Sequence, residues 1–162
     1  MHPGQRFSLS WVGLEVGSAA TARVTRAMAE IKFDVDGFPP AKGEALSMLG
    51  QHHSHAPRVL RLLEAARDAA AQAETPHFGS LRIGLELVLR CRRDRNRGDA
   101  TNYLGGLGDV LEGKAHRGQL EHLGEFARVA LYENDRQIEQ LRYRWEDAVE
   151  PSYTVRVWEL DA

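Results

Sequence analysis

The spacing of apolar residues changes along the chain, and this pattern constrains the fold more than any other feature. Residues 30–36 alternate apolar and charged side chains, which is typical of a strand with one buried face. Residues 57–72 begin with a proline and then carry apolar side chains every three or four positions, as a helix does. Residues 81–89 alternate again, with Ile or Leu at every odd position from 83. A strand, a helix and a second strand are therefore predicted in this order.

The second half of the chain continues with a short helix and further strands. Asp99 suits the N-cap of a helix over residues 100–111, because its carboxylate can accept a hydrogen bond from the first turn. A polar loop that includes Lys114 is expected over residues 113–124. The elements expected after it are the beginning of a strand at 129–132, a turn at Asn134–Asp135, a strand at 137–145 and a last strand at 153–160. This order predicts an α+β domain with a mixed sheet and two main helices, not a doubly wound sheet.

Size and composition fit a single domain. The chain has 162 residues, of which 43% are hydrophobic and 27% charged, enough for one moderate core. Because no apolar run approaches the roughly 18 residues of a membrane span, we expect no membrane partner. The single cysteine, Cys91, excludes an internal disulfide and suits the cytoplasm. We expect residues 30–162 to form the domain and residues 1–29 to be a poorly ordered extension, the alternative being an extra strand at 7–16.

Five arginines lie within eight residues, directly before the second predicted helix. They are Arg90, Arg92, Arg93, Arg95 and Arg97. Such a dense cluster of positive charge attracts phosphate groups. The net charge of -2 counts against nucleic-acid binding, since most small binders are basic overall, but a local patch can still bind a phosphate backbone. The alternative is that these arginines are the solvated end of a strand.

Oxygen-bearing side chains next to this strip could hold a divalent cation. Asp99 and Asn102 lie at the start of the predicted helix, and Asp109 follows Asn102 by seven residues, which is nearly the same direction on a helix. Asp135 lies far along the chain, in the predicted turn. The three aspartates converge only if the helix packs against that turn. Each also has an ordinary interpretation: an N-cap for Asp99, a solvated helix position for Asp109 and turn chemistry for Asp135.

Two adjacent glycines, Gly105 and Gly106, interrupt the predicted helix. Each costs about 1 kcal/mol of helix stability relative to alanine. A protein tolerates this cost where another helix, a backbone segment or a ligand must approach closely. We therefore expect a close approach at this point of the helix.

Three histidines in residues 51–55, together with His77, raise the alternative of a zinc site. No second cluster has the spacing of zinc ligands, so a polar loop is the preferred interpretation. Cys91 is interpreted as an ordinary strand residue, because no nearby base marks it as a nucleophile.

Three stretches of the chain resemble motifs of the RusA family of Holliday-junction resolvases. Residues 97–111, Arg-Gly-Asp-Ala-Thr-Asn-Tyr-Leu-Gly-Gly-Leu-Gly-Asp-Val-Leu, are similar to its signature helix, Asp-x-Asp-Asn-x-x-Lys-x-x-x-Asp-x-Leu. Residues 133–138, Glu-Asn-Asp-Arg-Gln-Ile, resemble its second motif, an acidic pair followed by x-Gln-Ile or x-Gln-Val. Residues 36–43 resemble its N-terminal strand and Gly-x-Pro-x-x-Lys turn. The order and spacing agree, and the resemblance covers about residues 30–160.

This resemblance implies a homodimeric α+β nuclease that cuts four-way DNA junctions in recombination and repair, using Mg²⁺ held by aspartates. Asp99 matches the first metal aspartate, Asn102 the asparagine of the helix motif, Asp109 the later helix aspartate and Asp135 the acidic residue of the second motif. The implied metal ligands are Asp99, Asp109 and Asp135, with Asn102 in support of catalysis. The expected DNA-binding residues are Lys42 and the five clustered arginines, Arg90, Arg92, Arg93, Arg95 and Arg97.

The chain departs from the family pattern at two positions. Thr101 stands where the second aspartate belongs, and Gly105 stands where the helix lysine belongs. Loss of one carboxylate should weaken Mg²⁺ binding. The second hypothesis is therefore a non-catalytic protein that binds branched DNA on the same fold. A third class, a structural interaction protein unrelated to DNA, remains as an alternative.

Overall fold

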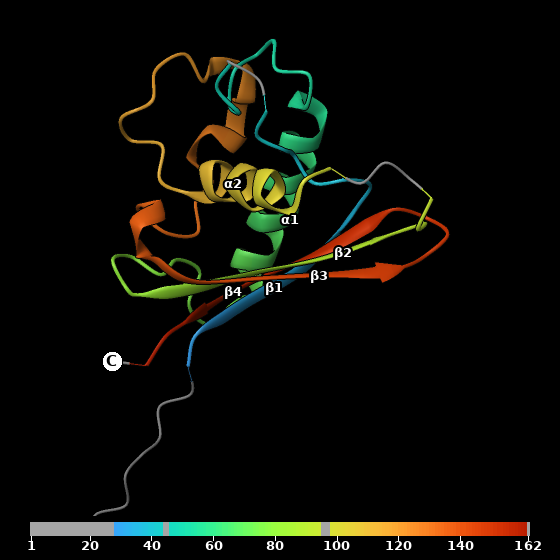
Figure 1. Cartoon of the computed structure of the whole chain (residues 1–162). Helices are drawn as coiled ribbons and strands as arrows, with labels where there is room; N and C mark the ends of the chain where they lie inside the picture. Colours follow the sequence, from blue (N-terminus) through green and yellow to red (C-terminus); the bar gives the residue numbers. More distant parts are fainter. Residues whose placement is uncertain (1–27, 44–45, 95–97, 162) are drawn as a thin grey trace, which may run out of the picture.

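A computed structural model describes residues 28–43, 46–94 and 98–161 of the chain. They form two layers, a four-stranded sheet with helices packed on one face (Figure 1). The elements in chain order are β1 (Glu30–Asp36), α1 (Ala56–Gln72), β2 (Ile83–Cys91), α2 (Ala100–Leu111), the 3₁₀ helices η1 (Glu121–Arg128) and η2 (Asp135–Gln137), β3 (Ile138–Asp147) and β4 (Ser152–Glu159). The α+β architecture with a mixed sheet is confirmed. The extension expected at 1–29 lies almost entirely outside the described residues.

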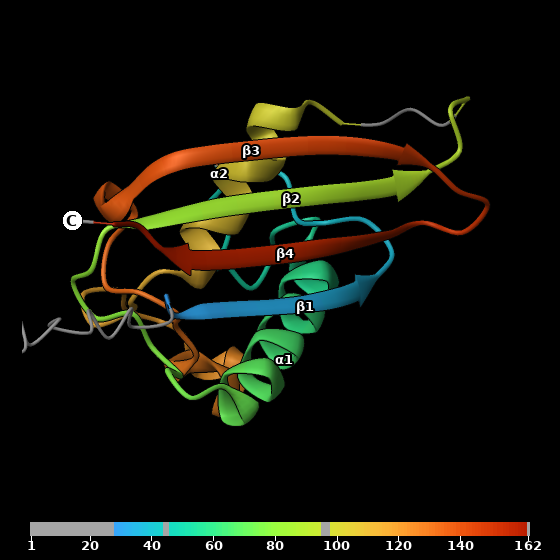
Figure 2. The same ribbon diagram turned by 90° about the horizontal axis from the view of Figure 1, so that it is seen from below.

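The sheet has the strand order β1-β4-β2-β3 (Figure 2). β4 is antiparallel to both of its neighbours, whereas β2 and β3 run parallel. A parallel pair needs a crossover connection, and here α2 supplies it. Because α2 returns toward the start of the next strand, its C-terminal half lies near the first residues of β3. This topology places the C-terminal end of α2 next to residues 133–138.

The hydrophobic core lies between the helices and the sheet. α1 buries Val59, Leu62, Leu63 and Ala66 against it, and β2 is the most buried strand, as its run of odd-numbered Ile and Leu residues predicted. Cys91 is buried at the end of β2, as expected of a strand residue. Within the described residues, no helix has the length and apolarity that crossing a bilayer requires.

The face of the sheet that points away from the helices is charged. Ion pairs connect neighbouring strands there, including Arg156 with Glu30 and Arg90 with Glu146. Because positive and negative side chains are interspersed on this face, it does not form a basic surface.

The helix boundaries agree with the sequence, but the strand expected at 129–132 is wrong. α2 spans the predicted residues 100–111, with Asp99 as its N-cap. In the segment 129–132, only Tyr132 forms a bridge, an isolated one with Glu112. Leu131 instead donates its backbone N–H to Leu111 and accepts one from Phe78. The segment therefore joins the end of α2 to a loop, and two strands, not three, follow α2.

The loop expected at 113–124 is also more ordered than predicted. η1 begins within it, at Glu121. Lys114 is only 8% exposed, because its ammonium donates to the carbonyl oxygens of Val110 and Val129, and to that of Glu112 at 3.2 Å. A lysine commonly satisfies the last carbonyls of a helix in this way, so Lys114 anchors the end of α2.

Candidate functional site

A pocket of about 300 Å³ lies between α2, the turn after β1 and the start of β3. Its lining residues are Lys42, Thr101, Leu104, Gly105, Gly108, Asp109, Asp135, Ile138 and Leu141. All of them except Leu141 lie in the three stretches that resemble the resolvase motifs. The structure thus brings together segments that are remote in sequence.

Asp109 and Asp135 share this pocket because of the topology. Asp109 lies in the last turns of α2, and Asp135 begins η2, directly before β3. A hydrogen bond of 3.0 Å from the Tyr132 hydroxyl to the carbonyl of Gly108 fixes the helix here. The helix thus packs against the Asn134–Asp135 corner, which was the condition for the aspartates to converge.

The two glycines of α2 allow the turn after β1 to approach the helix. A Cβ atom on Gly106 would lie 2.4 Å from the carbonyl oxygen of Pro40, and one on Gly105 would lie 3.3 Å from Cδ of Lys42. The close approach predicted from the glycine pair is therefore confirmed. The approaching groups are a backbone carbonyl and the stem of a lysine side chain.

The turn itself is held by three hydrogen bonds. Ala41 donates its N–H to Nδ1 of His55 at 3.0 Å, and Arg58 donates to the carbonyl of Pro39 at 3.3 Å. The N–H of Lys42 donates to the carbonyl of Asn102 at 2.9 Å. The backbone of Lys42 is therefore fixed against the first turn of α2.

Lys42 places its charge at the pocket. Its Nζ atom lies 2.9 Å from Oδ2 of Asp109, and 57% of the lysine side chain but only 17% of the aspartate side chain is exposed. The ammonium therefore neutralises a largely buried carboxylate and still faces solvent. The Lys42 side chain lies against α2 at Gly105, where the helix has no side chain of its own. It reaches this position from the turn after β1.

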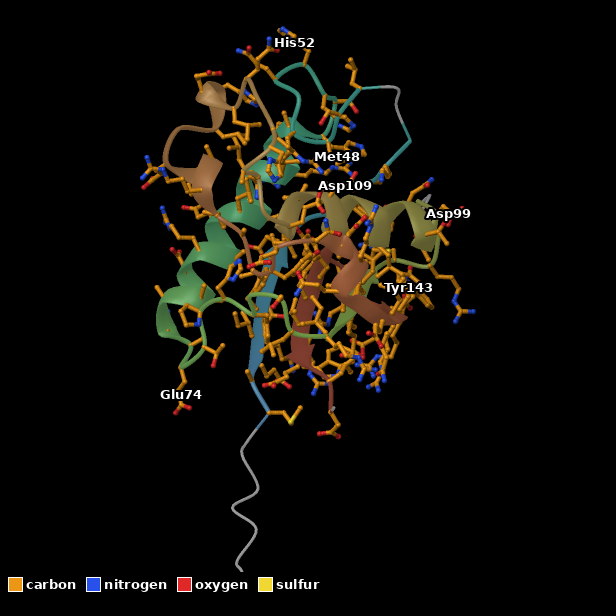
Figure 3. All side chains as sticks on the ribbon, turned by 90° about the vertical axis from the view of Figure 1, so that its left-hand side faces the viewer. Met48, His52, Glu74, Asp99, Asp109 and Tyr143 are labelled. Atoms are coloured by element: carbon orange, nitrogen blue, oxygen red, sulfur yellow. The ribbon has the colours of Figure 1, made fainter. Side chains whose placement is uncertain are left out.

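Asp99 lies apart from the other two aspartates. Its carboxylate accepts hydrogen bonds from the N–H of Thr101 at 2.8 Å and from the Thr101 hydroxyl at 2.7 Å, and the hydroxyl bond, ahead of the backbone bond, lowers the pKa of Asp99. Ten residues of helix separate Asp99 from Asp109, roughly 15 Å at the usual rise. Figure 3 shows them toward opposite ends of α2. One cation cannot contact both carboxylates.

The sequence hypothesis required the three aspartates to gather around one point. The structure does not bring Asp99 to the other two. Among the described residues, no group of three or more His, Cys, Asp and Glu side chains is arranged to hold a metal ion. Thr101, and not Asn102, shares the pocket-lining face of α2 with Asp109. Asn102 is exposed and contributes its backbone carbonyl to the turn instead.

A second group of residues lies next to the pocket and was not apparent from the sequence. Glu112 pairs with Arg117 and accepts a hydrogen bond from the N–H of Asp135 at 3.3 Å. Burial, followed by the charges of Glu112, Asp135 and Asp109, raises the pKa of Tyr132 well above its ordinary value. The available signal was the position of Glu112, three residues after Asp109 and at the C-cap of α2.

The described arginines of the strip do not form one surface. Arg90 is on the face of the sheet opposite α2, where it donates to Glu146 at 3.0 Å and to Thr154 at 2.8 Å. The guanidinium of Arg93 lies over the ring of Trp145, 5.3 Å from its centre. Arg92 is exposed, and Arg95 and Arg97 lie outside the described residues. Arg92 and Arg93 are thus the described members of the strip beyond the end of β2.

Two histidines of residues 51–55 accept hydrogen bonds from backbone N–H groups. His53 is 3% exposed, and its Nδ1 accepts the N–H of His55 at 3.0 Å. His55 in turn anchors the turn that carries Lys42. This arrangement gives two of the three histidines a structural function and favours the loop interpretation over the zinc site.

The sequence matches no family model and no curated protein. The resemblance to the resolvases therefore rests on the sequence motifs alone.

Proposed function

We propose that this protein is a structure-selective DNA endonuclease that acts on four-way junctions, as its resemblance to the RusA family implies. The observation that supports the proposal most is the shared pocket of Lys42, Asp109 and Asp135. These residues come from three separate stretches, each selected from sequence because it resembles a motif of that family. Two carboxylates and a solvent-facing ammonium suit a site that acts on a phosphodiester.

The resemblance also implies Mg²⁺, and the oxygen donors of the pocket are compatible with it. Mg²⁺ usually takes one or two carboxylates from a protein and completes its coordination with waters and substrate phosphates. Asp109 and Asp135 would supply the carboxylates, and the Thr101 hydroxyl lies on the same pocket. When bound, the ion would stabilise the negative charge that develops on the phosphate during hydrolysis. Asp99 would act through its hydrogen bond to Thr101.

Lys42 would bind the phosphodiester in this proposal. In the free protein its ammonium neutralises Asp109. A phosphate oxygen that enters the pocket offers the same ammonium a second anionic partner, and a flexible lysine stem can turn toward it. Arg92 and Arg93, beyond the end of β2, would contact backbone further along the DNA and thereby add affinity more than sequence preference.

The second candidate function is binding of branched DNA without cleavage. Two observations favour it: the Lys42–Asp109 ion pair already compensates one carboxylate, and Asp99 already caps α2. In this case the pocket would hold DNA only through charge and shape. A homodimer, which the resemblance also implies, would present two such pockets to opposite arms of a junction.

The two candidates differ in one assay, incubation of a synthetic four-way junction with the protein and Mg²⁺. The endonuclease proposal predicts paired nicks near the branch point, no nicks in EDTA, and none in a duplex of the same sequence. Junction binding without nicks would establish the second candidate. Binding to neither substrate would contradict both.

Replacement of Thr101 by aspartate tests the metal part of the proposal. The variant adds a carboxylate to the pocket, so we expect at least about tenfold lower Mg²⁺ concentration at half-maximal cleavage. Thr101→Asn, which fills the same space without the charge, is the control. If both variants need as much Mg²⁺ as the wild-type protein, position 101 does not face the metal.

A further inference from the structure

A second and larger hollow lies beside the pocket, between the loops 46–52 and 117–122. Its volume is about 1070 Å³, which is at the upper end of the range for small-molecule sites. His52, which lines the hollow, lies above Asp109 in Figure 3. It shares no lining residue with the pocket of Asp109 and Asp135.

The lining of the hollow suits a planar group with hydrogen-bonding edges. Leu49 and Leu120 form part of its apolar surface, with Leu49 3% exposed and Leu120 packed against the core. Polar groups of four side chains line it as well: Gln51, His52, Gln119 and His122. Amide and imidazole groups both donate and accept hydrogen bonds, and Gln can bind a base edge through two of them.

The charge of the hollow argues against a free phosphate as its ligand. Its arginine, Arg117, is paired with Glu112, and Glu121 adds a negative charge to the lining. A neutral ligand with polar edges fits this balance better than an anion.

Gln119 supplies an independent observation. Its φ of 61° is the one positive value found at a non-glycine residue among the described residues. Such a backbone costs on the order of 1 kcal/mol and tends to occur where a side chain must be aimed at a ligand. The strained residue here is one that lines the hollow.

The hollow is connected to the pocket through Glu112. One carboxylate oxygen of Glu112 binds Arg117, which lines the hollow. The other accepts the N–H of Asp135, which lines the pocket. A group bound in the hollow would therefore lie next to a DNA backbone bound in the pocket.

We propose that this hollow receives a nucleobase flipped out of the bound DNA at the branch point, near the position where the backbone enters the pocket. This inference rests on the proposed function. A base at a branch point is the appropriate ligand, because a base pair there lacks the continuous stacking of a duplex and so costs less to open, and extrusion is the route by which a paired base reaches a protein pocket. The leucine surface contacts its face, and Gln51 and Gln119 bind its edge.

The test compares junctions that carry normal nucleotides at the branch point with junctions that carry abasic nucleotides there. Affinities are measured by fluorescence anisotropy in EDTA, so that cleavage does not interfere. The wild-type protein should bind the normal junction about tenfold more tightly, as expected for the loss of one base contact. The variant Gln119→Gly should reduce this ratio to about twofold or less.

Gln119→Gly is chosen because glycine adopts positive φ freely, so the loop should keep its shape and the protein its thermal stability. Gln72→Ala, at the exposed end of α1, is the control and should keep the tenfold ratio. Equal wild-type affinities for the two junctions would overturn the inference, and so would an unchanged ratio in Gln119→Gly. The proposed function would survive either result as long as the wild-type protein still prefers junctions to duplex DNA. Loss of that preference in the wild-type protein would overturn both.

Discussion

The neighbouring glycines of α2 differ in what they contact, and alanine substitutions should separate the two contacts. In Gly106→Ala the new Cβ would lie 2.4 Å from the Pro40 carbonyl oxygen, so we expect a loss of about 1–3 kcal/mol from overpacking. In Gly105→Ala the nearest atom is in the stem of a lysine, at 3.3 Å. The gain in helix propensity should then dominate and stabilise the protein by about 0.5–1 kcal/mol.

Urea unfolding of the two variants measures these changes through the midpoint at constant m-value. Each variant is the control for the other, since both add one methyl group to adjacent positions of the same helix. Equal losses of stability would contradict the account of the turn packing on Gly106.

Lys42 is a residue whose charge should be visible in DNA binding. If its ammonium contacts a phosphate, Lys42→Ala should lower affinity for all DNA sequences and reduce the slope of log K against log salt by about 1. Lys32→Ala, which removes an exposed lysine from β1, is the control and should leave the slope unchanged. An unchanged slope in Lys42→Ala would mean that the ammonium only neutralises Asp109.

Part of the candidate site could be predicted residue by residue. Lys42, Asp109 and Asp135 were selected from sequence, and all three line the pocket. Asp99 was assigned to the same cluster, but the length of α2 separates it from Asp109 by roughly 15 Å. Its alternative interpretation, the N-cap, is confirmed. Glu112 was missed because its pairing with Arg117 and Asp135 depends on how the loop after α2 folds back.

Among the elements, the C-terminal end of α2 depends on one buried charge. Lys114→Met keeps the length of the side chain but leaves the carbonyls of Val110, Glu112 and Val129 without its ammonium. We expect a loss of about 1–3 kcal/mol at pH 7, which is the usual cost of leaving buried acceptors unsatisfied. Urea unfolding measures this change.

The same lysine should give the stability a dependence on alkaline pH. Burial lowers the pKa of Lys114 from 10.5 to about 8. Between these pH values the unfolded chain holds a proton that the folded protein has lost, so this group makes the free energy of unfolding rise with pH. The difference in stability between wild type and Lys114→Met should therefore grow from pH 8 to pH 10. A constant difference would show that the ammonium stays protonated in the fold.

Elements with a clear local signal were predictable, and those fixed by distant contacts were not. The bounds of α2 follow from Asp99, which caps the helix through its own side chain. The apolar segment 129–132 has a local pattern that also suits a strand. It is bonded instead to Leu111 and Phe78, and these partners depend on the tertiary structure. For the same reason Lys114 was placed in a polar loop although it is buried.

At the scale of the whole molecule, the site results from the crossover between two parallel strands. α2 leaves the end of β2 and returns toward the start of β3. This path places Asp109 beside Asp135 and leaves Asp99 at the other end of the helix, while Lys42 arrives from the turn after β1. The order of the elements was predictable, but this convergence depends on which strands are neighbours.

The most direct test of the account is a double-mutant cycle on junction cleavage with Asp109→Asn, Asp135→Asn and the double variant, at fixed Mg²⁺. If the two carboxylates act as one site, each single variant should lose most of the cleavage rate, and the double variant should be no slower than the worse single variant. Junction affinity in EDTA is measured alongside, to show that each variant still folds and binds. Single losses that multiply in the double variant, or a single variant that cleaves like the wild type, would contradict the claim that Asp109 and Asp135 form one catalytic pocket.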